Sequence, residues 1–314
     1  MFLKMDTYFL SPNTSATIQL FNGTFDKSDN VITRDRMNDV SLVGNGIRTK
    51  VDTTQWTEKE DITLLNFKTG TEGTWVAGVS TDPRDFEQTA ESFNKYLKHD
   101  GVFDMLDWRK QNDALDKAAN ERYSKHVKTI FQVGERKTDD WQTVLDYPIE
   151  FVPMTNPYTA KKGGELSCKL LWKGQPLPNH LVYVGSGANG HDHSHDDGHE
   201  HEGEDHHHDA TQLRTDANGI VTMQLPNEGL WYLRTIYMEQ VDHSGLTHES
   251  NWATLTFQVG HNHQHADGAH SHDHDHAHGH SHGDGHTHGL PSYAYWVLGT
   301  LLLVGILFWL KKKS

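Results

Sequence analysis

Short runs of alternating apolar and polar residues, separated by turn residues, make up most of the first 80 residues. Residues 17–21 and 62–67 alternate in this way. Asn22-Gly23 and Gly44-Asn45-Gly46 are typical turn sequences. Regularly spaced runs of this kind predict antiparallel strands packed as a β-sandwich.

A second series of strand-like runs occupies residues 147–259, with turn sequences at Gly163-Gly164, 174–178 and 215–219. About seven short strands with regular turns are typical of an immunoglobulin-like or transthyretin-like sandwich. Cys168, the only cysteine, lies in one of these runs. A single cysteine excludes an internal disulfide framework. We expect the thiol of Cys168 to be buried and inert.

Between the two series the period changes to that of helices. Phe93, Tyr96 and Leu97 follow a Ser/Thr- and Glu-containing start, and His99-Asp100-Gly101 ends this helix. A longer helix is predicted over residues 115–131, which are rich in Ala, Lys, Glu and Arg. Its Tyr123, Val127 and Ile130 would form one buried face.

The predicted fold class is therefore mainly β: two immunoglobulin-like or transthyretin-like β-sandwich domains joined by a short helical segment, plus one C-terminal transmembrane helix. The predicted domains are an N-terminal sandwich (1–85), a helical connecting segment (86–140), a C-terminal sandwich with a histidine-rich loop insertion at 187–209 (141–260), a histidine-rich linker (261–289) and the transmembrane helix (290–311).

Two histidine runs interrupt this pattern. The insertion contains eight histidines and eight acidic residues, and the linker contains twelve histidines, mostly as His-x-His. The candidate metal ligands are His191, His193, His195, His199, His201, His206, His207, His208, His261, His263, His265, His270, His272, His274, His276, His278, His280, His282, His286 and His288.

Neutral imidazole suits Ni²⁺, Co²⁺, Zn²⁺ and Cu²⁺. In an extended chain, residues i and i+2 project to the same side about 7 Å apart, so neighbouring histidines can close on one ion. Ordering such a chain costs about 1–2 kcal/mol per residue. We therefore expect several moderate, exchangeable sites for Ni²⁺ or Co²⁺, with Zn²⁺ as an alternative.

The linker adjoins an uncharged apolar segment, residues 293–310, followed by Lys311, Lys312 and Lys313. Eighteen helical residues span about 27 Å, close to the thickness of a bilayer core. The three lysines predict a cytoplasmic C-terminus and an extracytoplasmic, periplasmic bulk of the chain. Residues 1–20 lack a signal-peptide pattern, so we expect that the true leader is missing or that the sequence starts at an internal Met. The alternative is a tail-anchored cytosolic protein.

Charge and motifs narrow the function further. The formal net charge of -15 excludes a nucleic-acid partner, because no basic stripe is available to neutralise phosphates. Enzyme signatures are absent from the sequence, and the protein is expected not to be an enzyme. The isolated His99, His126 and His180 are expected to be structural or solvated, with His126 on a helix surface, whereas His243 and His248 with Glu249 form a weaker candidate site.

An ordered set of short motifs carries a family resemblance over about residues 5–260: Phe93-x-x-Tyr96-Leu97-x-x-x-Gly101, Glu121-Arg122-Tyr123-Ser124-Lys125-x-x-Lys128, Tyr147-Pro148-Ile149-Glu150-Phe151-Val152-Pro153, Asn156-Pro157-Tyr158, Gly174-x-Pro176-Leu177, Thr215-Asp216-x-x-Gly219, Gly229-x-Trp231 and Trp252-Ala253-Thr254-Leu255-Thr256-Phe257. With them the chain resembles bacterial periplasmic nickel-uptake components of the domain-of-unknown-function type, found beside energy-coupling-factor nickel and cobalt transporters. The resemblance implies two sandwiches joined by a helical segment and a role in metal handling. The histidine-containing start of the family is missing here.

The sequence thus predicts a single-pass, membrane-anchored extracytoplasmic protein that captures Ni²⁺ or Co²⁺, or Zn²⁺, through its histidine-rich segments and supplies a metal permease. Two alternatives stay open. One is a metal buffer or detoxification protein without a transporter partner. The other is a structural surface protein whose histidine runs are pH-responsive spacers.

Overall fold

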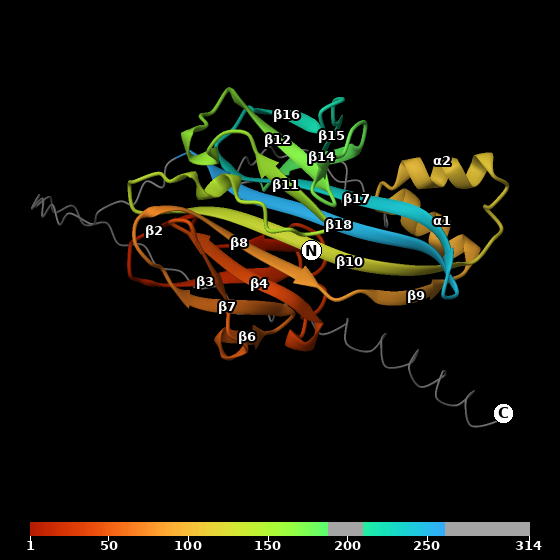
Figure 1. Ribbon diagram of the computed structural model, residues 1–314, viewed down its shortest axis with the longest axis horizontal. Coiled ribbons are helices and arrows are strands. Elements are labelled where there is room, and N and C mark those ends of the chain that lie inside the picture. The colour runs from red at the N-terminus through yellow and green to blue at the C-terminus, as the bar shows by residue number, and fades with distance from the viewer. Residues whose placement is uncertain (188–209, 261–314) are drawn as a thin grey trace, which may run out of the picture. The chain divides into compact units, whose positions relative to one another are not determined.

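The computed structural model describes residues 1–187 and 210–260, which all belong to one compact unit. These residues form three β-sheets and two α-helices (Figure 1). The expectation of a mainly β protein is confirmed, and the sheets fit a β-sandwich arrangement. Short 3₁₀ turns occur at Arg34–Arg36, Thr53–Gln55, Asp139–Gln142 and Pro157–Thr159.

The largest sheet, here called the central sheet, has ten strands drawn from both halves of the chain. In spatial order they are β15 (Thr211–Arg214), β14 (Leu181–Ser186), β17 (Gly229–His243), β18 (Leu246–Val259), β10 (Ala119–Val133), β8 (Gly73–Thr81), β4 (Met37–Gly44) and β5 (Ile47–Lys50), with β2 (Phe9–Leu10) and β9 (Arg84–Gln88) also paired to β10. The parallel pairing of β10 with β18 joins the two halves.

Two four-stranded sheets accompany it. The N-terminal sheet contains β1 (Phe2–Lys4), β3 (Ser15–Phe21), β7 (Ile62–Lys68) and β6 (Trp56–Lys59). The C-terminal sheet contains β11 (Ile149–Pro153), β12 (Gly164–Trp172), β13 (Gln175–Pro176) and β16 (Ile220–Leu225).

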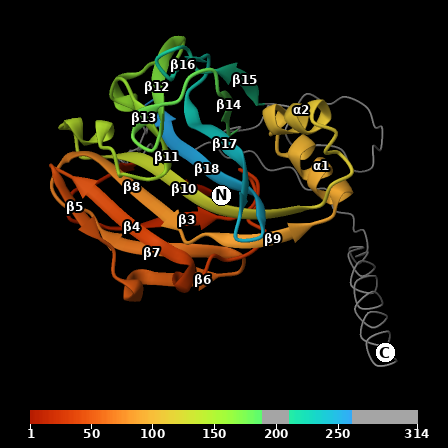
Figure 2. The same cartoon turned by 45° about the vertical axis from the view of Figure 1, so that its right-hand side comes forward.

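These smaller sheets cover opposite faces of the central sheet. Phe131 of β10 packs against Phe67 of β7, with ring centroids 5.7 Å apart. Lys128 of the same strand points the other way and contacts Glu150 of β11. Because successive strand residues face opposite sides, one long strand supplies both interfaces. Figures 1 and 2 show the C-terminal sheet on one side of β10 and β18 and the N-terminal sheet on the other.

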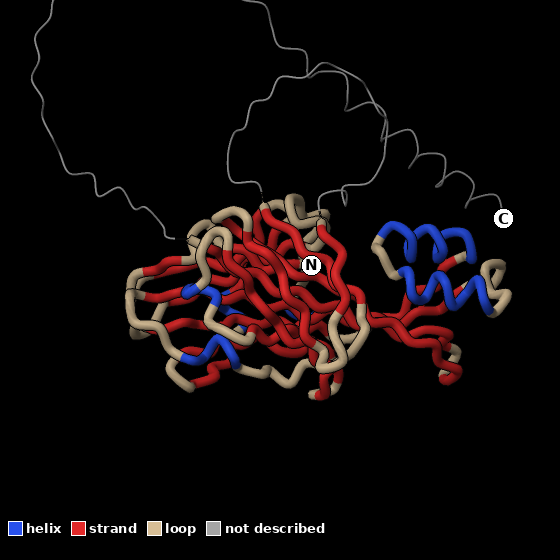
Figure 3. The backbone as a smooth tube through the Cα atoms, turned by 90° about the horizontal axis from the view of Figure 1, so that it is seen from above, coloured by secondary structure: helices blue, strands red, loops and turns tan. Residues whose placement is uncertain are grey.

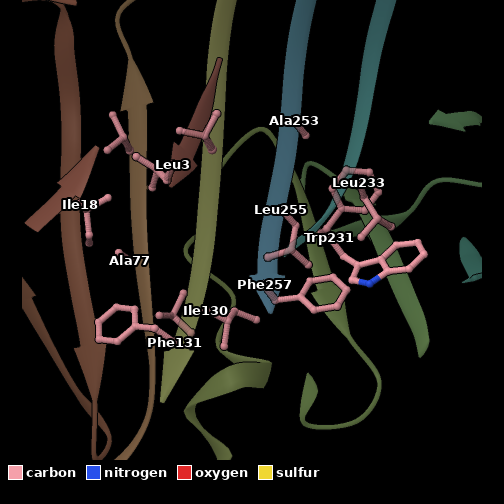
Figure 4. Packing of buried hydrophobic residues seen from close by; sticks show 14 of the residues in the cluster. Leu3, Ile18, Ala77, Ile130, Phe131, Trp231, Leu233, Ala253, Leu255 and Phe257 are labelled. Atoms are coloured by element: carbon pink, nitrogen blue, oxygen red, sulfur yellow. The ribbon is translucent and has the colours of Figure 1, made fainter. Parts of the chain in front are cut away.

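One continuous hydrophobic core fills both interfaces. Ile18 and Phe131 are completely buried on the N-terminal side, and Leu255 and Phe257 on the C-terminal side. Figure 4 shows these two groups of side chains separated by the strands of the central sheet. Cys168 belongs to this core, and burial raises the pKa of its thiol to about 12, as expected for an inert cysteine.

Helices α1 (Ala90–His99) and α2 (Phe103–Gln111) pack at the far end of the long strands, away from the small sheets (Figure 3). The backbone N–H of Ser92 donates to the Thr89 side chain at the start of α1. Phe93 and Leu97 are fully buried in a second core cluster with Ile236 of β17. This helix was correctly predicted from its spacing and its end signals.

Gly101 ends α1 in the left-handed conformation, with φ +73°. A β-carbon at this position would overlap the Tyr183 hydroxyl, which donates a hydrogen bond to the Gly101 carbonyl. We expect Gly101→Ala to lower the free energy of unfolding by about 2–4 kcal/mol, from left-handed strain plus overlap. Urea unfolding measures this.

Gly163 is the matched control. Its φ is +80°, but a β-carbon there would meet no atom within 4 Å. Gly163→Ala should therefore cost only the conformational part, about 1–2 kcal/mol. If the two substitutions lowered the free energy of unfolding equally, the overlap with Tyr183 would not contribute to the loss at Gly101.

The predicted helix over residues 115–131 is wrong, because β10 occupies 119–133. Residues 121–129 pair with 248–256 of β18, and 119–123 pair with 84–88 of β9. The helix-forming composition misled the sequence prediction. Glu121, His126 and Lys128 are polar residues of the kind expected on an exposed helix, but all three are buried, with partners on distant strands.

The central sheet runs across the predicted boundaries at residues 85 and 140. The division into separate sandwich domains stays a prediction. Within residues 1–187 and 210–260, no helix has the length and apolar character needed to span a bilayer. The predicted transmembrane helix at 290–311 lies outside these residues.

Candidate functional site

All twenty candidate histidine ligands lie outside the described residues. This holds for His191, His193, His195, His199, His201, His206, His207 and His208 of the insertion, and for the histidines from His261 to His288 of the linker. Metal binding by them stays a prediction. The structure does describe the strands from which both segments leave.

The insertion connects two paired neighbouring strands. Val184 of β14 lies opposite Thr211 of β15 in an antiparallel pair. The described chain stops at Gly187, whose N–H donates to the carbonyl of Leu230, and resumes at Ala210. The sequence prediction that the insertion lies between two strands is confirmed.

The linker starts close to the same point. Ser186 of β14 lies opposite Trp231 of β17, which lies opposite Phe257 of β18. Two strand spacings correspond to about 10 Å. Val259, the last residue of β18, is opposite Gly229. Both histidine-rich segments therefore leave the folded unit at the same end of the same sheet, where Figure 2 shows β14, β17 and β18 side by side.

A cavity of about 570 Å³ lies at the base of the insertion, with Ser186 and Ala210 in its wall. We call it the insert cavity. Its floor is the central sheet, and its other walls come from residues 1–2, the loop after β3 and the end of α1. Its ionisable lining residues are Met1 with its amino terminus, Asp26, Asp29, His99, Asp100, Lys125 and Arg234.

Lys125 is a buried cation of this cavity. Its Nζ donates to Asn22 Oδ1 at 2.9 Å and lies 4.9 Å from the centre of the Trp252 ring. Burial lowers the pKa of Lys125 to about 8, and Asp100 partly opposes this shift. Arg234 Nη1 lies 3.5 Å from Asp100 Oδ1, so the second cation has a carboxylate neighbour.

The insert cavity offers carboxylate oxygens and an imidazole, which are ligand types for divalent metals. They do not converge on one point. In the described part of the chain, no three His, Cys, Asp or Glu side chains are placed to hold one metal ion together. The described residues of the cavity therefore do not form a complete metal-coordination site.

A smaller cavity of about 320 Å³, here called the aromatic cavity, shares Asp100, Lys125 and Trp252 with the insert cavity. Its remaining lining residues are Phe86, Gln88, Tyr96, Glu121 and Tyr123. Tyr96 and Trp252 are parallel within 8°, with ring centroids 6.1 Å apart.

The floor of the aromatic cavity is held by Glu121, which is 3% exposed. Its carboxylate accepts hydrogen bonds from the Tyr96 hydroxyl at 3.2 Å, from Gln88 Nε2 at 3.3 Å and from the Ser250 hydroxyl. Burial raises the pKa of Glu121, and the hydrogen bonds from Ser250 and Tyr96 oppose that shift. The pKa of Tyr96 lies well above its usual value because of burial and the Glu121 charge, so Tyr96 stays a donor.

Three isolated histidines have structural positions. His126 is buried in β10, where its Nδ1 lies 2.9 Å from Ser80 Oγ and its Nε2 lies 3.0 Å from Asn251 Oδ1. The expectation of a helix-surface residue is wrong here, because the segment is a strand. His180 immediately precedes β14, as predicted, and His99 is the last residue of α1.

His243 and His248 do not form a joint site. His243 Nε2 lies 3.4 Å from Glu249 Oε1 at the exposed end of the β17–β18 hairpin. His248 is buried instead, with its ring centroid 4.6 Å from that of Phe93 in α1. Because adjacent strand residues face opposite sides, Glu249 and His248 cannot serve one ion.

Sequence reasoning missed Asp100, Glu121, Lys125 and Trp252 as cavity residues. The alternation Glu121-x-Tyr123-x-Lys125 is a signal that could have found three of the cavity residues, since it places them on one strand face. It was hidden by the helix prediction for the same segment.

A family model for a domain of unknown function, DUF4198, matches residues 1–239. No curated protein matches the chain.

Among solved structures, the D0-D1 domain of intimin is similar at 12% identity, covering 82% of this chain and 96% of that chain, with a TM-score of 0.17. A Salmonella alpha-2-macroglobulin mutant is similar at 10% identity, covering 81% of this chain and 14% of its own, with a TM-score of 0.20. A group B streptococcus pilus 2b backbone protein has 10% identity, coverages of 82% and 98%, and a TM-score of 0.15. At these TM-scores none of the three bears on the fold or function of this chain.

Proposed function

The chain belongs to the DUF4198 family, whose description assigns no function, and we propose that this member is a membrane-anchored, extracytoplasmic protein that captures Ni²⁺ or Co²⁺, or Zn²⁺, and supplies a metal permease. In this proposal the histidine-rich segments collect the ion and the residues 290–311 anchor the chain. The sandwiches, which we assign to the immunoglobulin-like or transthyretin-like type, form the rigid platform.

One observation carries the proposal. The stems of the two histidine-rich segments lie at one end of the central sheet, about two strand spacings apart. Twenty histidines are thereby attached to a small area of the surface. A high local concentration of ligands lets histidines from both segments share one ion and raises the effective affinity without a new contact.

The insert cavity adds an electrostatic argument. Asp26 and Asp29 line its wall beside Ser186 and Ala210, the residues that flank the insertion. These carboxylates can add weak oxygen ligands for a divalent cation but do not trap it, because they do not converge and because Lys125 and Arg234 line the same cavity. Reversible capture is what a protein that delivers metal requires, since a tightly coordinated ion would not be passed on.

Calorimetric titration of the full chain in detergent micelles with NiCl₂, CoCl₂ and ZnCl₂ tests the proposal. Three variants replace with asparagine the eight insertion histidines, the twelve linker histidines, or all twenty, so that length and polarity are kept. We expect multi-site binding at pH 7.5 that falls by at least about tenfold in affinity at pH 5.5, because protons compete for imidazole. The variant in which all twenty histidines are replaced should lose this multi-site binding.

The two single-segment variants report on sharing. If the two segments share ions, replacing the histidines of either segment should remove a larger fraction of the tight metal-binding sites than the fraction of the twenty histidines that it replaces. Independent, additive losses would contradict the argument from the common stem position. Binding heat that remains after all twenty replacements would place the metal site in the folded unit. If the native chain gives no binding heat, the metal proposal fails, and the alternative that the histidine runs are pH-responsive spacers is favoured.

Uptake separates delivery from buffering. In cells grown at limiting nickel or cobalt, the twenty-histidine variant should show reduced accumulation of the metal. A loss of tolerance at high metal, with normal uptake at low metal, would favour the buffer or detoxification alternative instead.

A further inference from the structure

We propose that the aromatic cavity is a binding site for a neutral, hydroxyl-bearing ring, the chemistry of a pyranose sugar. The cavity volume of about 320 Å³ suits a single ring. This site shares Asp100, Lys125 and Trp252 with the insert cavity but requires no metal.

Four aromatic side chains line the cavity, and Phe86 among them presents an exposed flat apolar surface of the kind such a ring needs. Phe86, Tyr96, Tyr123 and Trp252 come from four different elements, namely β9, α1, β10 and β18. Phe86 is 54% exposed on the edge strand β9, although a side chain of this size is usually buried. An exposed aromatic ring at the mouth of a cavity is available to stack on a ligand.

The polar groups are mixed in character. Lys125 and the Gln88 amide supply donors, whereas Asp100 and the Gln88 oxygen supply acceptors. A sugar ring carries hydroxyls that both donate and accept, so it can satisfy both kinds of group.

The charges argue against an ionic ligand. An organic anion would face Asp100 and the Glu121 carboxylate, and an organic cation would face the Lys125 ammonium, which already lies over the rings of Trp252 and Tyr123. A neutral ligand avoids both repulsions.

The cavity is also held in a fixed shape. The buried Glu121 carboxylate accepts hydrogen bonds from Tyr96 and Gln88, two of the wall residues. Walls that are fixed before binding reduce the ordering cost that a weakly binding ligand has to overcome. Glu121 is therefore a positioning residue for this site.

Saturation-transfer difference NMR on the full chain in detergent micelles tests the proposal, with EDTA present to exclude metal effects. The probes are methyl α-glucoside, methyl α-galactoside, methyl α-mannoside and N-acetylglucosamine as neutral sugars, with tetramethylammonium and benzoate as charged probes. We expect saturable transfer to the ring protons of at least one sugar at millimolar concentrations, and none to the charged probes.

Phe86→Ala should weaken sugar binding by about tenfold, because it removes the exposed wall, and it should leave the fold intact because Phe86 lies on the surface. Ile47→Ala is the matched control: Ile47 is 67% exposed on β5, another edge strand, and its removal should leave sugar binding unchanged.

Saturable binding of tetramethylammonium or benzoate in place of sugar would overturn the assignment of ligand class. Absence of saturation by all four sugars, or equal loss in the Phe86 and Ile47 variants, would overturn the site. Neither outcome touches the metal proposal, whose readout is calorimetric heat from Ni²⁺, Co²⁺ or Zn²⁺.

Discussion

Replacing Glu150 with glutamine should lower the free energy of unfolding by about 3–5 kcal/mol, because it leaves the Lys128 ammonium buried without its counter-charge. Both side chains are 1% exposed, and Lys128 Nζ lies 2.9 Å from Glu150 Oε2. The pair bridges β10 and β11, which belong to the two sheets that enclose the C-terminal core.

Glu150 also fixes the chain before β11. Its carboxylate accepts hydrogen bonds from the backbone N–H groups of Leu145 at 3.0 Å and Tyr147 at 3.2 Å, while Lys128 donates to the Thr143 carbonyl at 3.0 Å. Lys128→Met should therefore cost a similar amount, since it leaves a buried carboxylate with only backbone donors.

The double variant Lys128→Met/Glu150→Gln gives the sharpest test. It buries no charge, and the glutamine oxygen can still accept from one of the two backbone N–H groups, that of residue 145 or that of residue 147. We expect its free energy of unfolding, measured by urea unfolding, to exceed that of either single variant by about 1–3 kcal/mol. Additive losses would contradict the interpretation. The exposed pair Lys110–Asp107 is the control, and Lys110→Met should cost less than about 0.5 kcal/mol.

Acidification from pH 7 to pH 5 should remove about 5 kcal/mol from the free energy of unfolding through three histidines alone. Burial lowers the pKa of His126, of His180 and of His248 to about 4 in each case, below the ordinary value of 6.5. The folded chain therefore keeps these rings neutral while the unfolded chain takes up protons. Stability is full above about pH 6.5 and falls as the pH drops towards 4.

Urea unfolding followed by tryptophan fluorescence at several pH values measures this slope. His126→Gln should reduce the loss between pH 7 and pH 5 by about 1–2 kcal/mol, at the expense of some stability at neutral pH. His243→Gln is the control, because its side chain is 53% exposed. An unchanged slope in the His126 variant would contradict the assignment. The same curves serve as a control for the metal titration, because they test whether the chain is folded at pH 5.5.

Several features of the fold were predictable because they depend on neighbouring residues. The β4–β5 turn has Asn45 and Gly46 in left-handed conformations, as the Asn-Gly signal indicates. Residues 17–21 and 62–67 lie in β3 and β7. The start of α1 at Thr89 and its end before Gly101 follow from capping chemistry.

The candidate site was predictable only in part. Composition identified the histidine-rich segments, since no packed core can be made from them. The residues of the two cavities were not identified, because a cavity is made by elements that are distant in the sequence. Lys125, Asp100 and Asn22 meet although more than 100 residues separate Asn22 from Lys125.

The sequence alone determined the mainly β class, two strands of the N-terminal half, most strands of the C-terminal half, the helix α1 and the place of the insertion between two strands. Each of these depends on the spacing of side chains within about ten residues. Only the tertiary structure decided that residues 119–133 form β10 and that β10 pairs with β18 to unite the halves in one sheet. The reason is that Glu121, His126 and Lys128 become acceptable inside a protein only when partners such as Ser250, Asn251 and Glu150 are brought to them by the fold.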